Sequence, residues 1–215
     1  MELYFAPLAC SMSARIALNE ASAAVRLVEV DTRAGRVVST GEDYRAVNPL
    51  GCVPALKLED GSVLTENAAI LQYIADQYPQ ARLAPAPADR QGRARLQQWL
   101  SFIGTELHKG LMTPLLGETT PPEVKAWTLA KYAPRLAYLD RALKGREFLL
   151  DRFSVADAYL TTILNWTGAT PQIDLSAYPN VKAYLERMRA RPSVAGALAA
   201  ELPLFHAGVA RRKAA

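Results

Sequence analysis

Apolar residues in the first third of the chain follow strand spacing and helix spacing in turn. Residues 2–6 and 25–30 are short apolar runs, which predict two strands. Between them, residues 14–21 are rich in helix formers and carry apolar side chains on one face. A strand, helix, strand order of this length favours parallel pairing of the two strands. The polar segment 31–44 that follows predicts irregular structure.

A hairpin and a second helix are predicted next. Residues 55–58 and 62–64 are short apolar runs on either side of Asp60-Gly61, the strongest short-range signal for a β-hairpin. Apolar side chains then recur at helical spacing up to residue 74, so a helix is predicted to start near Glu66. The sequence leaves both isomers of the Val53-Pro54 peptide bond open. The first 78 residues therefore have the order βαβ followed by ββα.

The rest of the chain is predicted to be helical. The prolines between residues 78 and 88 mark the clearest linker, and an amphipathic pattern from Leu96 to Leu111 predicts a long helix. Pro134 lies within another helical pattern and is expected to kink or divide it. Further helices are opened by Pro121-Pro122, by a capping box at Ser154 to Asp157, by Pro179 and by Pro192. We predict an α/β plus all-α protein: an N-terminal domain over residues 1–78, a linker over 79–88 and an all-helical domain over 89–215.

Composition excludes several classes of protein. Half of the 215 residues are hydrophobic and 21% are charged, which is typical of a globular chain. The net charge of +4 is mild, and the basic run Arg211 to Lys213 is interpreted as a solvated tail, so no nucleic-acid partner is predicted. Two cysteines are too few for a disulfide framework or a zinc site, so no metal is expected. No secretory leader or stretch of membrane-spanning length is recognised, which predicts a cytoplasmic protein without a membrane partner.

Two places in the first domain carry candidate chemistry. Cys10 precedes a predicted helix, where the positive end of the helix dipole favours the thiolate. Glu66 and Asn67 open the next helix, and with its unpaired N–H groups they can hold the amino and carboxylate ends of a zwitterion. The alternative is that Thr65 or Asn67 only caps this helix and Glu66 only favours its dipole. Taken alone, Cys10 is more often a buried small residue than a catalyst.

The order of elements resembles the thioredoxin and glutaredoxin folds. Cys10-Ser11-Met12-Ser13 is then a C-x-x-S version of their redox motif, in which the second cysteine is missing. The resolving step of a dithiol oxidoreductase is therefore unavailable within this motif. Whether Cys52 approaches Cys10 and replaces the missing thiol stays open.

With its proline-rich linker and helical second domain, the whole chain resembles the cytosolic glutathione S-transferases, and most of all the bacterial beta class. The motifs that carry this resemblance are Leu3-Tyr4-Phe5 with Ala9-Cys10-Ser11, Asn48-Pro49-Leu50-Gly51, Val53-Pro54-Ala55-Leu56, Thr65-Glu66-Asn67-Ala68-Ala69-Ile70 and Glu106-Leu107-His108-Lys109-Gly110. They extend from Leu3 to about Leu202. The resemblance implies a thioredoxin-like N-terminal domain, glutathione as co-substrate and a homodimer.

The same resemblance assigns roles to individual positions. Cys10, Ser11 and His108 correspond to the catalytic residues, and Trp166, Leu8 and Met112 to the electrophile site. The residues assigned to glutathione binding are Arg36, Cys52, Val53, Pro54, Glu66, Asn67, Ser101, Thr105 and Lys109. Among these, Val53 corresponds to the backbone anchor for the cysteinyl part, with Pro54 the cis-proline, and Glu66 and Asn67 correspond to the pair that binds the γ-glutamyl group. His108 and Lys109 correspond to helical-domain residues that reach over the thiol.

Three positions depart from the family pattern. Phe5 replaces the usual tyrosine, Cys52 stands where glutamine is usual, and Ser101 stands where the class often has an asparagine that serves the partner's site. The leading prediction is a detoxifying glutathione transferase that conjugates glutathione to small apolar electrophiles. One alternative is a glutathione-dependent thiol-disulfide reductase or peroxidase that uses Cys10. The other is a non-catalytic ligand-binding protein, which the missing tyrosine would suit.

Overall fold

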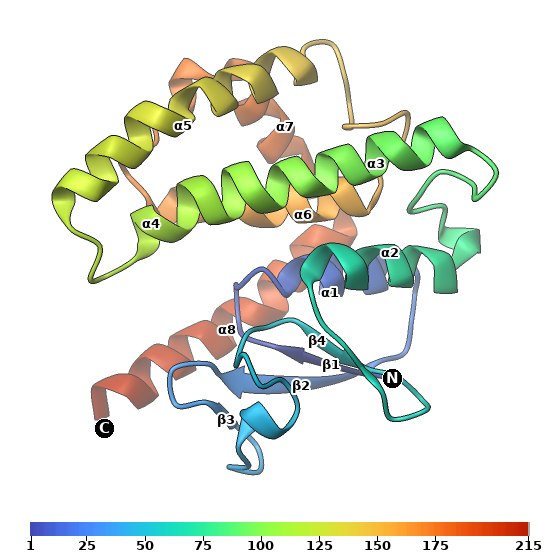
Figure 1. Cartoon of the computed structure of the whole chain (residues 1–215), viewed down its shortest axis with the longest axis vertical. Coiled ribbons are helices and arrows are strands. Elements are labelled where there is room, and N and C mark those ends of the chain that lie inside the picture. Colours follow the sequence, from blue (N-terminus) through green and yellow to red (C-terminus); the bar gives the residue numbers. More distant parts are fainter. Residues whose placement is uncertain (215) are drawn as a thin grey trace. The chain divides into compact units, whose positions relative to one another are not determined.

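A five-stranded mixed sheet forms the centre of the first of two structural units. The computed structural model describes residues 1–214, and the first unit contains Met1–Leu83 together with the C-terminal segment from Pro192. Its elements are β1 (Glu2–Phe5), α1 (Met12–Glu20), β2 (Arg26–Asp31), β3 (Arg36–Val37), β4 (Ala55–Lys57), β5 (Val63–Leu64), α2 (Asn67–Gln77) and α8 (Pro192–Ala214). The strand order is β3-β2-β1-β4-β5, with β1 parallel to β2 and the other pairs antiparallel. Figure 1 shows α1 and α2 on the same face of this sheet. The thioredoxin-like order predicted from the sequence is confirmed.

The predicted hairpin is present with a simple register. Leu56 pairs with Leu64 and Lys57 with Val63 across an antiparallel β4–β5 pair. Gly61 in the turn has a φ of +84°, a conformation that glycine adopts without steric cost. The Val53–Pro54 bond, which the sequence left open, is cis.

The segment predicted to be irregular contains one more strand. Val37 and Arg36 of β3 pair with Val30 and Asp31 at the end of β2. Tyr44 follows in a short 3-10 helix and is fully buried in a cluster on one side of the sheet. The members of this cluster are Tyr4, Val28, Val30, Val37, Tyr44 and Ala55. The irregular segment therefore covers part of the sheet, which its polar composition did not indicate.

The second unit, Ala84–Arg191, is helical. Its helices are α3 (Arg90–Phe102), α4 (Thr113–Leu116), α5 (Pro122–Leu143), α6 (Val155–Asn165) and α7 (Pro179–Ala190), and a π-helical segment, Ile103–Met112, joins α3 to α4. Short 3-10 helices occupy Trp166–Ala169 and Leu175–Ala177. The predicted division of a helix at Pro134 is wrong, because α5 continues through this residue. Proline removes one backbone hydrogen bond, and the remaining bonds of this long helix hold it together.

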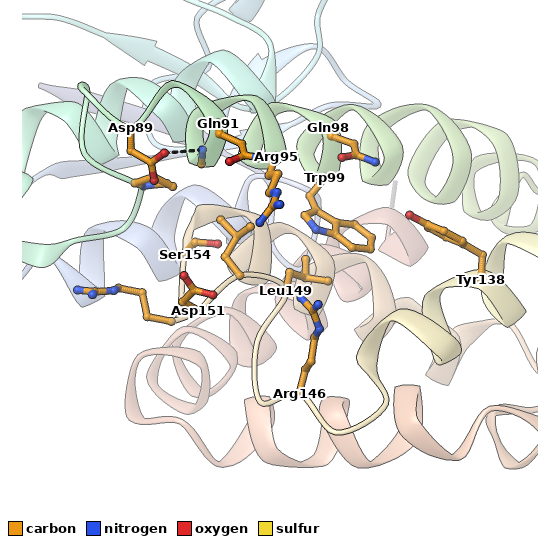
Figure 2. Close-up of a pocket in the computed structure, with 14 residues that line it drawn as sticks. Asp89, Gln91, Arg95, Gln98, Trp99, Tyr138, Arg146, Leu149, Asp151 and Ser154 are labelled. Carbon is orange, nitrogen blue, oxygen red and sulfur yellow. Dashed lines mark hydrogen bonds between the residues drawn. The ribbon is translucent and has the colours of Figure 1, made fainter.

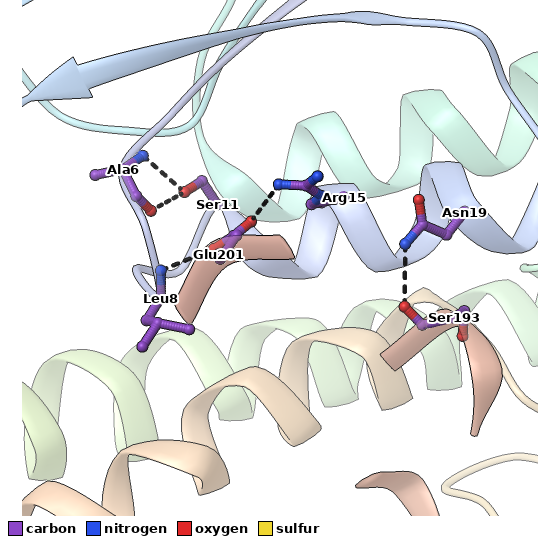
Figure 3. A network of polar contacts seen from close by, with 7 residues as sticks. All are labelled: Ala6, Leu8, Ser11, Arg15, Asn19, Ser193 and Glu201. Atoms are coloured by element: carbon purple, nitrogen blue, oxygen red, sulfur yellow. Dashed lines mark hydrogen bonds and ion pairs between the residues drawn. The ribbon is translucent and has the colours of Figure 1, made fainter. Parts of the chain in front are cut away.

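The last helix departs from the predicted domain boundary. The sequence placed residues 89–215 in one helical domain, whereas α8 belongs to the first unit with the sheet. Asn19 Nδ2 of α1 donates to the Ser193 carbonyl at 3.0 Å (Figure 3). The Ser193 hydroxyl donates to Glu20. The basic run Arg211 to Lys213, at the end of α8, is helical rather than a free tail. Within it, Arg211 Nη2 lies 2.6 Å from Glu29 Oε1 of β2.

One helix among residues 1–214 is long and apolar enough to cross a membrane by length and composition. This is α8 over Pro192–Lys213, with a mean hydropathy of 1.3. The sequence analysis missed it because alanines rather than large apolar side chains supply much of its hydropathy. Length and composition are weak indications for a single helix, and this one carries the fully buried carboxylate of Glu201.

Candidate functional site

The Cys10 thiol lies at the end of the turn between β1 and α1. Cys10 Sγ donates a hydrogen bond to the Val53 carbonyl at 3.1 Å, which brings two of the predicted site residues together. The turn itself is held by Ser11, which is fully buried. Ser11 Oγ accepts from Ala6 N at 3.2 Å and donates to Ala6 O at 3.1 Å. In this arrangement Ser11 fixes the shape of the turn, and its proton is directed at the backbone rather than at a bound thiol.

The start of α2 is strained in a way that capping does not explain. Glu66, the residue before the helix, has a φ of +67° and makes no side-chain cap. Such a backbone costs about 1–3 kcal/mol in a residue with a side chain and is concentrated at functional sites. The Asn67 amide is buried and turned to α1, where Nδ2 donates to Ser13 Oγ at 2.9 Å. The exposed Glu66 carboxylate and the first N–H groups of α2 are thus available to a ligand.

Two residues that sequence analysis did not assign hold the chain just before Val53. The Cys52 carbonyl accepts from Tyr44 Oη at 2.8 Å and from Asn48 Nδ2 at 2.7 Å. Burial raises the pKa of Tyr44 to about 12, so its hydroxyl stays protonated and remains a donor. The Cys52 thiol is exposed and forms no disulfide. Their burial depends on how the chain folds back over the sheet, so the sequence carries no signal that identifies Tyr44 or Asn48.

Arg36 is the last of the glutathione-binding residues predicted in the first unit, and its side chain contacts the backbone of the following loop. Arg36 is exposed in β3, and its Nη1 donates to the Gly41 carbonyl at 2.7 Å. Its predicted contact with a glycyl carboxylate stays a prediction.

Glu201 of α8 supports the turn that carries Cys10, as Figure 3 shows. Its Oε2 accepts from Leu8 N at 2.7 Å, and its Oε1 lies 3.5 Å from Arg15 Nη1. Leu8 itself has a φ of +58°, so the contact stabilises a backbone that a leucine rarely adopts. Sequence analysis missed Glu201; the signal was a carboxylate four residues after Ala197, on the buried face of an apolar helix.

We expect Glu201→Gln to change how stability depends on pH. Burial raises the pKa of Glu201 to about 7 from 4.5, although the Leu8 N–H and Arg15 oppose the shift. Because the folded pKa is the higher one, this stabilisation is complete below pH 4.5 and is lost as the pH rises through 7. The shift corresponds to about 3 kcal/mol. Urea unfolding at pH 5 and pH 8 should show Glu201→Gln gaining about 2–3 kcal/mol relative to wild type at the higher pH. The same difference in free energy of unfolding between variant and wild type at both pH values would contradict this expectation. Glu59→Gln, on the exposed hairpin, is the control.

In the second unit, four of the predicted residues lie on the π-helical segment: Thr105, His108, Lys109 and Met112. His108 is 7% exposed, and its Nδ1 lies 2.7 Å from Tyr159 Oη on α6. The Trp166 ring packs edge-on against the imidazole with centroids 5.1 Å apart. A π-helical turn is rare and is frequently found at functional sites. Tyr159, which sequence analysis did not assign, thus fixes the ring that the resemblance marks as catalytic.

The other predicted residues of this unit differ in exposure. Met112 is fully buried, with its Sδ 4.0 Å from Thr170 Oγ1. Ser101, Thr105 and Lys109 are exposed, and Thr105 Oγ1 donates to the Ser101 carbonyl at 3.0 Å. Their side chains are therefore available to a ligand, whereas the Met112 side chain is not.

His108 is expected to stay neutral through the whole physiological range. Burial, with a smaller contribution from Lys109, lowers its pKa to about 4 from 6.5. As the pH falls, the His108 ring of the unfolded chain is protonated before that of the folded chain. His108 therefore lowers the free energy of unfolding as the pH falls from 6.5 towards 4. An NMR titration of the His108 ring should show no change between pH 8 and pH 5.5 in the folded protein. A midpoint near 6.5 would contradict the burial argument.

Comparison with known proteins gives consistent matches to one family. The models for the N-terminal and the C-terminal domain of glutathione S-transferases match residues 9–77 and 105–192. The chain is 43% identical over 202 residues to "Glutathione S-transferase GstA" of Escherichia coli O157:H7, covering 94% of this chain and 98% of that protein. It is 35% identical over 209 residues to "Glutathione S-transferase GST-4.5" of Xanthomonas campestris, with the same coverage.

Solved structures agree with the sequence relatives. A sphingomonad glutathione S-transferase complexed with glutathione is similar with a TM-score of 0.88 and 44% identity, covering 94% of this chain and 98% of that one. The bacterial beta-class enzyme of Sphingomonas chungbukensis has a TM-score of 0.87 and 45% identity at the same coverage.

Proposed function

The chain belongs to the glutathione S-transferase family, and we propose from this premise that it transfers the glutathione thiolate to small apolar electrophiles. The family and the two-part fold predicted from the sequence motifs are confirmed. The observation that carries the proposal for this chain is the 3.1 Å contact of Cys10 Sγ with the Val53 carbonyl. It places a thiol beside a backbone group that can pair with an extended peptide.

Glutathione binding follows from the groups around this contact. The Val53 N–H and carbonyl pair with the cysteinyl part of the tripeptide, since a carbonyl has a second lone pair. The γ-glutamyl carboxylate lies at the N-terminus of α2, where N–H groups and the helix dipole favour an anion. Glu66 supplies the negative charge for the γ-glutamyl amino group. The tripeptide sulfur is then held beside Cys10.

Cys10 acts as a hydrogen-bond donor to the bound sulfur. The thiolate is the reacting form, and each unit by which its pKa falls stabilises that form by about 1.4 kcal/mol. On binding, the Cys10 S–H turns from the Val53 carbonyl to the glutathione sulfur. Ser11 has a positioning role here, because its hydroxyl is bound to the Ala6 backbone. His108, Lys109 and Trp166 are assigned to the same reaction by their match to the family motif.

Two rates separate conjugation from disulfide reduction. We expect kcat/KM with an activated aryl halide to exceed that with a glutathione mixed disulfide. The reverse ranking would favour a reductase in which Cys10 attacks the disulfide, forms a mixed disulfide with glutathione and releases the other thiol. Mass spectrometry after incubation with oxidised glutathione then locates the adduct, with Cys10→Ser and Cys52→Ser as the paired variants.

We also propose a cytoplasmic homodimer with a role in detoxification. Several large apolar side chains are exposed, among them Leu50 (74%) in the first unit, and Trp127 (57%) and Val124 (41%) on α5. Exposed apolar groups of this size favour burial in an interface. We expect a dimeric mass at micromolar concentration by light scattering, and a shift towards monomer in Trp127→Glu. A monomeric wild type would contradict the proposal.

A further inference from the structure

A cavity of about 370 Å³ lies within the second unit, and none of its lining residues is assigned to glutathione or the electrophile. It lies between α3 with the residues just before it, Tyr138 of α5 and the segment from Arg146 to Ser154 (Figure 2). We propose that this cavity binds a small aromatic molecule with a single negative charge, such as an aryl sulfonate or carboxylate. The volume is within the range of small-molecule sites. All of its walls come from one unit, and the inference does not depend on the proposed function.

Two aromatic rings form one wall of the cavity. Trp99 and Tyr138 have ring centroids 6.0 Å apart at 34°, and Phe102 packs edge-on against both. Tyr138 remains 40% exposed although it has these neighbours. Rings held in this way offer a flat apolar surface, on which a planar aromatic ligand gains more than area burial alone.

Three arginines supply the charge. Arg95, Arg146 and Arg152 line the cavity, and within residues 1–214 none of their side chains forms an ion pair. Figure 2 shows Arg95 on α3 and Arg146 on the opposite wall, with Leu149 between them. A guanidinium binds a carboxylate or sulfonate through two parallel hydrogen bonds, which makes arginine the usual residue for this recognition.

The acidic residues of the cavity decide the sign and size of the ligand charge. Asp89 and Asp151 also line it, so three positive groups face two negative ones. One of the two carboxylates is already engaged, because Asp89 Oδ1 accepts from Gly92 N at 2.8 Å and caps α3. Three guanidinium groups and two carboxylates give the lining a net charge of +1. This charge fits a monoanion better than a cation or a polyanion.

Calorimetric titration with naphthalene-2-sulfonate tests the proposal on the full chain. We expect saturable binding, about tenfold or more weakened in Arg95→Gln and in Arg146→Gln, since a hydrogen bond to a charged group is worth that much. Arg141→Gln, an exposed arginine near the end of α5 outside the cavity, is the matched control and should bind as wild type does. Naphthalene-2-methanol, which has no charge, should bind at least tenfold more weakly.

Three outcomes would overturn the inference. They are the absence of saturable binding at millimolar concentration, equal binding of the sulfonate and the alcohol, and binding unchanged in both arginine variants. Because both substituted side chains are exposed, their unfolding midpoints should match wild type, which separates lost contacts from lost folding. Trp99→Leu provides the independent check on the aromatic wall and should weaken both ligands.

Discussion

Replacing Asp157 by alanine is expected to lower the free energy of unfolding by about 4 kcal/mol or more, because four buried donors lose their acceptor. Asp157 is fully buried at the start of α6. Its Oδ1 accepts from Leu149 N and from Tyr184 Oη at 2.9 Å each. Its Oδ2 accepts from the Ser154 N–H and hydroxyl, also at 2.9 Å. The alanine variant leaves four buried donors without an acceptor, and each lost partner costs about 1–3 kcal/mol.

Urea unfolding of the purified variants measures this loss. Asp151→Ala, six residues earlier and exposed, is the matched control and should change stability by less than about 0.5 kcal/mol. Asp157→Asn keeps one acceptor oxygen and should fall between the two. Burial raises the pKa of Asp157 even though four donors oppose the shift. A loss below about 1 kcal/mol in Asp157→Ala would contradict the network.

The second large effect concerns ligand affinity: Glu66→Ala should weaken glutathione binding by about tenfold to a hundredfold. The proposed contact joins the Glu66 carboxylate to the γ-glutamyl ammonium group. Hydrogen bonds to charged groups contribute about 1.5–3 kcal/mol, which corresponds to that range. Glu59→Ala, a carboxylate on the neighbouring hairpin, is the control and should leave the dissociation constant unchanged. Unchanged affinity in Glu66→Ala would remove Glu66 from the site.

A glycine at the same position separates binding from backbone strain. The φ of +67° at Glu66 is unfavourable for any side chain and costs glycine nothing. Glu66→Gly should therefore weaken glutathione binding as alanine does, while it raises the free energy of unfolding by about 1 kcal/mol. Lower stability in the glycine variant would mean that the carboxylate, rather than strain, dominates this position in the folded protein.

Local patterns explain why much of the first unit could be predicted. The strands β1 and β2, the hairpin around Gly61 and the start of α2 each depend on residues close together in the sequence. Strand β3 is only two residues long and depends on its pairing with β2, so its own composition carries no strand signal. The same holds for Tyr44, which is buried because the chain folds back over the sheet.

Long-range contacts explain most of what the sequence did not reveal. The apolar pattern of α8 does not indicate which element it packs against. Its contacts through Ser193, Glu201 and Arg211 place it in the first unit. Tyr159 lies in a helix whose residues Val155–Leu164 are all buried, so its contact with His108 could not be read from the sequence pattern. Ser11 was expected to act on the thiol, yet its own preceding turn uses both its donor and its acceptor. The motifs indicated where each of these residues lies in the chain, but not which group its side chain contacts.

Calorimetric titration of the purified chain with reduced glutathione tests the central claim most directly. The account predicts saturable binding at one site per chain, weakened in Glu66→Ala and unchanged in Glu59→Ala. The absence of saturable heat at millimolar glutathione, in a protein that unfolds cooperatively, would contradict it.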